Sequence, residues 1–107
     1  MDATPDIIVR ETLFGRKPGE ERFAIAIEVG RPFAWGGASP TEYACRVAAE
    51  PIMSMVAIHG EGPTQALCLA LRHVRFFLDS FQNDGGVIED IDLDATMPFR
   101  PYSFEGT

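Results

Sequence analysis

Alternation between apolar and polar residues runs through the first half of the chain and predicts β-strands. Because successive side chains of a strand point to opposite faces, an apolar residue at every second position marks a strand with one buried face. The clearest example is formed by Phe23, Ile25, Ile27 and Val29, with Ala24, Ala26 and Glu28 between them. Further strands are predicted at residues 6–14, 43–49 and 52–58. Their short connections favour an antiparallel meander.

A long helix is predicted from Pro63 to about Gln82, where apolar residues recur at helical spacing. Pro63 suits the first helical position, where its missing N–H costs nothing, and Gly62 is an acceptable cap. The apolar stripe would pack on the sheet. Its members are Ala66, Leu67, Ala70, Leu71, Val74, Phe77, Leu78 and Phe81.

The remaining segments are predicted from their turn residues. Pro and Gly pairs interrupt residues 30–40, which we expect to form a loop with Trp35 in its middle. Residues 83–86 end the helix, residues 87–94 alternate like a fifth strand, and residues 95–107 form an irregular tail on the surface. We therefore expect a single α+β domain over residues 1–107, an antiparallel sheet of four or five strands with one helix on one face.

Composition removes several classes of partner. The net charge is -7, from sixteen acidic and nine basic side chains, and it repels a phosphate backbone, so we expect no nucleic acid. No stretch approaches the ~20 apolar residues that span a bilayer, and the first residues lack the pattern of a signal peptide. We expect a cytoplasmic protein in which Cys45 and Cys68 are free thiols.

Metal and nucleophilic chemistry find little support in the residue spacing. The zinc-type ligands are scattered without a paired motif: Cys45, His59, Cys68 and His73. Residues 90–94 begin like a calcium loop, but Ala95 replaces the turn glycine and Pro101 stands where the glutamate belongs. We expect no metal, cofactor or catalytic residue, and Gly60–Pro63 to be a tight turn rather than a phosphate site.

The opening of the predicted helix carries a resemblance. The run Gly60-x-x-x-x-Gln65-Ala66-Leu67 resembles a family of short, uncharacterised bacterial domains with a G-x-D-x-x-Q-A-L helix opening. Arg31-Pro32, Trp35 and Tyr43 fit an upstream stretch of the same family, whose usual aspartate is Gly62 here. The resemblance implies a small bacterial α+β protein with no established activity, and some such domains look like immunity proteins or other toxin partners. No catalytic residue carries over.

Two surfaces are candidates for contact. Leu69 and Phe76 project together on the helix side opposite the stripe, near Gln65 and Arg72, so either the tail or another chain would cover them. Trp35, which Gly36 and Gly37 follow in the loop, either anchors a partner or plugs the end of the sheet. The sequence therefore favours a protein-interaction module, with a homodimer as one form.

The alternative is a small-ligand binder or enzyme. It would use a cleft at the end of the sheet, between the predicted loop and the strand that precedes the helix. We expect such a cleft to be lined by Trp35, Tyr43 and His59.

Overall fold

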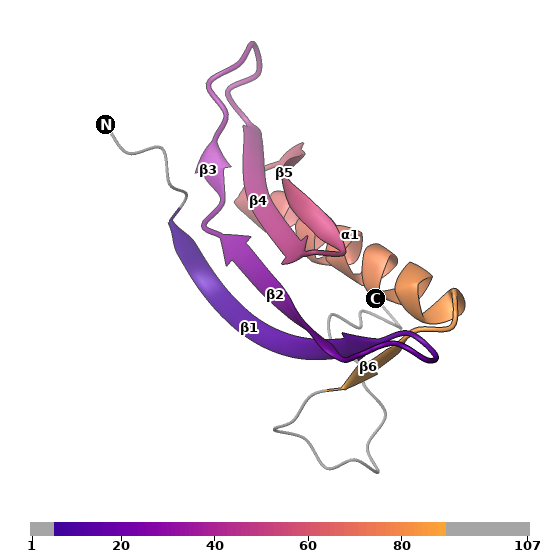
Figure 1. Ribbon diagram of the computed structural model, residues 1–107. Coiled ribbons are helices and arrows are strands. Elements are labelled where there is room, and N and C mark those ends of the chain that lie inside the picture. The colour runs from indigo at the N-terminus through magenta and orange to yellow at the C-terminus, as the bar shows by residue number, and fades with distance from the viewer. Residues whose placement is uncertain (1–5, 90–107) are drawn as a thin grey trace.

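The computed structural model describes residues 6–89 and confirms the α+β class (Figure 1). The strands are β1 (Ile7–Arg16), β2 (Phe23–Gly30), β3 (Phe33–Ala34), β4 (Glu42–Glu50), β5 (Met53–Glu61) and β6 (Val87–Glu89), and the helix is α1 (Pro63–Asn83). All six strands belong to one antiparallel sheet, and α1 packs against one face of it. The predicted tail at residues 95–107 and residues 90–94 of the predicted fifth strand lie outside the described residues.

The long strands pair in the order of a meander. Within the described part of the chain β1 pairs with β2, β2 with β4 and β4 with β5, while β6 adds to the other side of β1. The expected loop at residues 30–40 is wrong in one respect, because it contains β3. This two-residue strand pairs with the start of β4, beyond the point where β2 stops. So short a strand shows no alternation that a sequence pattern could reveal.

The core lies between the sheet and α1, as the alternation predicted. Its members are the strand residues Leu13, Ile25, Ile27, Val29, Cys45, Val47, Ala49, Met53 and Ile88 and the helix residues Ala66, Ala70, Val74, Leu78 and Phe81. Each large side chain buried there stabilises the fold by about 1.5–3 kcal/mol. The helix does not sit centrally, for it lies against β4 and β5 (Figure 1).

Small residues let α1 begin close to β5. A Cβ atom added at Gly60 would lie 2.7 Å from the backbone nitrogen of Ala66. Gly62 caps the helix with a φ of 89°, a conformation that favours glycine where the resembling family has aspartate. Its N–H donates to the carbonyl of Thr41 at 2.8 Å, and its carbonyl accepts from Ala66 at 3.1 Å. The helix start is thereby fixed to the end of the sheet.

The helix ends one residue beyond the predicted limit. Asp84 follows the last helical residue, and its N–H donates to the carbonyl of Ser80 at 3.1 Å. Gly85 then takes a φ of 101°, which turns the chain toward β6. The turn residues between 83 and 86 therefore act as the sequence predicted.

Candidate contact surface

Phe76 is the most exposed large apolar side chain among residues 6–89, with 65% of its surface exposed. Its ring contacts that of Phe77 edge to face at 5.5 Å, and Phe77 in turn lies 5.1 Å from the imidazole of His73. These ring contacts hold Phe76 in place on the outside of the helix. An exposed but anchored aromatic ring is typical of an interaction surface.

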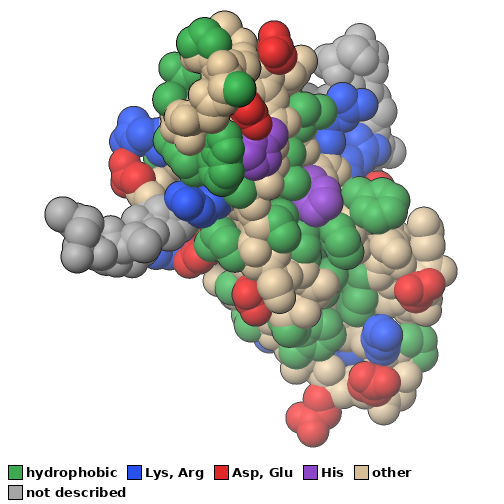
Figure 2. Space-filling model, turned by 90° about the horizontal axis from the view of Figure 1, so that it is seen from above, with side chains coloured by type: hydrophobic (Ala, Val, Ile, Leu, Met, Phe, Trp, Pro, Cys, Tyr) green, Lys and Arg blue, Asp and Glu red, His purple; other side chains and the backbone are tan. Residues whose placement is uncertain are grey.

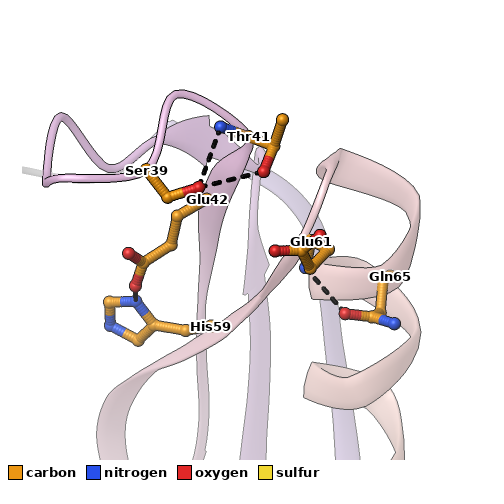
Figure 3. Close-up of polar contacts among 6 residues, drawn as sticks. All are labelled: Ser39, Thr41, Glu42, His59, Glu61 and Gln65. Carbon is orange, nitrogen blue, oxygen red and sulfur yellow. Dashed lines mark hydrogen bonds and ion pairs between the residues drawn. The ribbon is translucent and has the colours of Figure 1, made fainter.

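The other helix residues predicted with Phe76 differ in how far they are exposed. Leu69 is half-buried, whereas Arg72 and Gln65 are exposed. The side-chain carbonyl of Gln65 also accepts a hydrogen bond from the N–H of Glu61 at 2.6 Å, so it closes the turn into the helix (Figure 3). Gln65 therefore stabilises the turn into the helix, whether or not it also contacts a partner.

The exposed side of α1 that bears Phe76 continues onto β5. Phe77 lines the same hollow as Ile52, the residue that leads into β5, so this side of the helix faces that strand. Met55 and Val56 of β5 are each 36% exposed. Val56 lies on the helix face of the sheet, because it pairs with the core residue Val47, whereas Met55 points to the opposite face. We define Val56, Leu69 and Phe76 as the β5 strip.

Both histidines of the chain are visible in the view of Figure 2, where they are coloured purple. His59 belongs to β5 and His73 to α1, and hydrophobic side chains lie between and around them. The sequence did not single out Met55 or Val56. The available signal was the run at residues 52–58, which is too apolar for a strand with one face in water.

On the other face of the sheet, Trp35 and His59 lie together. Trp35 is 45% exposed, and its ring centroid is 4.4 Å from that of His59. The Nδ1 atom of His59 lies 2.7 Å from Oε2 of Glu42, which fixes the orientation of the imidazole (Figure 3). Phe33 of β3 contacts Trp35 at 6.1 Å and is itself covered by the guanidinium of Arg46 at 4.5 Å. The short strand β3 therefore builds this aromatic group.

Tyr43, the third residue of the predicted cleft, lies on the helix face of the sheet. It pairs with Gly60, whose Cα faces Ala66 of the helix, and its side chain packs against the core. The sheet therefore separates Tyr43 from Trp35 and His59. The structure brings two of the three residues together.

Two hydroxyls lie in the turn that leads into Glu42, the partner of His59. Ser39 and Thr41 hydrogen-bond to each other at 3.0 Å in the turn before β4 (Figure 3). Among residues 6–89 no three His, Cys, Asp or Glu side chains gather in a way that could hold a metal ion. The arrangement at His59 offers an oriented imidazole and an aromatic surface for contact.

An open hollow of about 350 Å³, which the sequence did not indicate, lies at the end of the helix. It is lined by Lys17, Phe23, Pro51, Ile52, Phe77, Ser80, Phe81 and Asp84. Its walls come from the β1–β2 turn, the β4–β5 turn and the last turns of α1. The hollow adjoins the β5 strip through Phe77.

Comparison of the chain with family models, with curated proteins and with solved structures gave no match. The resemblance at the helix opening therefore stays a prediction. In the part of the chain that the structure describes, no helix combines the length and the apolar character needed to cross a membrane.

Proposed function

We propose that this protein is a protein-interaction module whose contact surface is the β5 strip. The main support is Phe76, which is 65% exposed on the helix that packs against β5, where Val56 is also exposed. Water around such side chains is unfavourable by roughly 25 cal/mol for each Å² of apolar surface. A partner that covers the strip would recover this free energy.

The distribution of charge supports the same surface. The net charge of the chain is -7, yet residues 51–60 and 62–78 contain no Asp or Glu. These two segments form the turn into β5, nearly all of β5 and most of α1. Charged residues are depleted at the centre of protein interfaces, because their desolvation is costly. These two segments therefore suit a contact better than the rest of this acidic chain.

The proposal includes a cytoplasmic setting and, through the resemblance, a bacterial and immunity-protein-like role. Cys45 and Cys68 are both free, and Cys45 is buried. Free thiols fit a reducing compartment. The partner would be a protein, which agrees with the expected absence of nucleic acid and membrane partners.

Photo-crosslinking tests the proposed surface directly. A benzophenone amino acid in place of Phe76 should give a covalent adduct of defined mass in the host cells, because that ring lies in the contact. The same group in place of Gln82, also exposed on α1 but turned away from Phe76, serves as the matched control. Adducts are identified by mass spectrometry. Equal labelling from both positions, or none from either, would contradict the proposal.

A second candidate function uses Trp35 and His59. The supporting observation is the imidazole that Glu42 orients at 2.7 Å beside an exposed indole, an arrangement suited to stacking with a small planar ligand. Trp35 is the only tryptophan, so its fluorescence reports this site alone. A fragment that binds there should change the emission of the intact protein and have no such effect on the His59→Ala variant. Identical titrations of both proteins would remove this candidate.

A further inference from the structure

Strand β5 is an edge of the sheet with few of the features that normally protect an edge. Within the described residues it pairs only with β4, so its outer N–H and C=O groups are free of strand partners. Native edges are usually blunted by charges, prolines or bulges. Between Met53 and Gly60 there is no charged Lys, Arg, Asp or Glu and no proline. The bulge opposite Val47–Ala49 falls near the start of β5 and leaves the later residues regular.

The middle of this edge and the outer side of α1 lie at the same level. The helix starts at the end of β5 and runs back along it, since Gly60 approaches Ala66 at one end and Ile52 shares a hollow with Asp84 at the other. From Gly60 back to Ala57 the strand covers about 10 Å, a length that a helix covers in about 6 to 7 residues.

Counting that length from Ala66 places the level of Ala57 between Arg72 and His73. This point is midway between Leu69 and Phe76, which are seven residues apart. A twofold axis beside Ala57 therefore lies at the same level along the strand as the centre of the apolar pair on the helix.

We propose that the partner is a second copy of this chain, with β5 of each copy paired antiparallel across a twofold axis at Ala57. The two sheets would form one continuous sheet, with both helices on the same face. Val56 would then oppose Ile58 of the other copy, and Phe76 would meet the other copy's Leu69. The inference rests on the proposed function, because it uses the same β5 strip.

A single twofold rotation would cover both the outer edge of β5 and the exposed Phe76 on the helix. This favours a second copy over an extended peptide. A peptide could pair with the edge of β5 but would leave Phe76 exposed on the helix above it. A twofold axis is the usual symmetry of homodimers, in which the same patch serves both subunits. Each chain has a net charge of -7, and the segments that would meet, residues 53–60 and 62–78, contain no acidic residue in either copy.

The first test is the mass of the intact protein by light scattering over a wide range of concentration. We expect twice the 11.8 kDa of one chain. Val56→Lys places a charge on the edge and Phe76→Glu places one on the helix, and each should raise the dissociation constant at least about tenfold. Both positions are exposed, so circular dichroism should show folded variants. A wild-type chain that is monomeric at every concentration would overturn the inference.

A cysteine at the axis tests the register. In a Cys68→Ser background, Ala57→Cys should form an intermolecular disulfide with added oxidant, because the two Cα atoms would be about 4.5–5.5 Å apart. Ser54→Cys is the control, since its two copies would be about 20 Å apart. A dimer that is crosslinked equally at both positions, or at neither, would show that β5 does not pair in this way.

The two proposals fail in different ways. A monomeric chain whose position 76 crosslinks to a different protein would refute the dimer and leave the interaction module in place. An absence of any adduct from position 76, together with a monomeric mass, would refute both.

Discussion

The two edges of the sheet, at β1 and at β5, differ in the charges and bulges that hinder pairing with another strand. The outer edge at β1 carries Arg10, which pairs with Glu28 at 2.9 Å, and a bulge interrupts its pairing between Ile7 and Val9. The short strand β6 covers its far end. At the opposite side, β5 carries no Lys, Arg, Asp or Glu until Glu61, and its only irregularity is near its start.

This difference indicates which edge is suited to a partner. Charges and bulges at an edge oppose the addition of another strand, because a new strand would have to desolvate the charges or follow the distortion. The β1 edge has both features although Val9 there is 42% exposed. An exposed apolar residue is therefore not enough to define a contact surface. At β5 the apolar residues coincide with an uncharged backbone edge and with Phe76 on the helix.

The largest expected effect concerns the packing of α1 on β5. Gly60→Ala should lower the free energy of unfolding by about 2–3 kcal/mol, because overpacking forces the backbone of the helix start away from the strand. Gly15→Ala on β1 is the matched change, since its Cβ would meet the end of the Ile25 side chain at 2.9 Å, which can rotate. We expect a loss of about 1 kcal/mol there. Urea unfolding measures both, and equal losses would show that β5 is not the more tightly fitted side.

The rate at which the buried Cys45 thiol reacts measures how often β5 separates from β4. Cys45 is fully buried on β4 opposite Ile58, and burial raises the pKa of its thiol, so less thiolate is present at a given pH. Cys68 is half-buried. We expect Cys45 to react with a disulfide reagent at least about tenfold more slowly than Cys68, with rates that rise with pH. Comparable rates for the two thiols would mean that β5 opens readily from β4.

The smallest expected effect is at the charged edge. The ion pair of Arg10 and Glu28 is largely solvated, with 69% of the Arg10 side chain exposed, so Arg10→Thr should change the free energy of unfolding by less than about 0.5 kcal/mol. The solution mass should also stay unchanged, because the bulge still distorts this edge. A new oligomer formed by this variant would show that charge alone separates the two edges.

Much of the fold was predictable from local patterns. Alternation at Phe23–Val29 and in the other long strands identified the buried face, and helical spacing after Pro63 identified α1. Turn residues placed the connections nearly where they occur. Residues 33 and 34 were missed because their strand exists only through pairing with β4.

The candidate surfaces were predictable only in part. The helical repeat placed Leu69 and Phe76 together, and the structure shows Phe76 exposed and Leu69 half-buried. Trp35 and His59 lie together, as expected. Tyr43 was expected to join them, but the register of β4 and β5 places it on the opposite face of the sheet. A shift of one residue reverses the face of every side chain, and turn residues such as those near Pro51 do not reveal it.

The sequence by itself determined the class of the fold, the meander of long strands, the helix and the side of each that is buried. These features depend on periodicity and on the conformations of proline and glycine, which are local properties of the chain. The tertiary structure alone decided that, within residues 6–89, β5 forms an edge of the sheet and that α1 packs against it. It also decided that the exposed Val56 lies on the helix face of the sheet, beside the helix that bears Phe76. Such neighbourhoods depend on which strand lies beside which, and nonlocal pairing sets them.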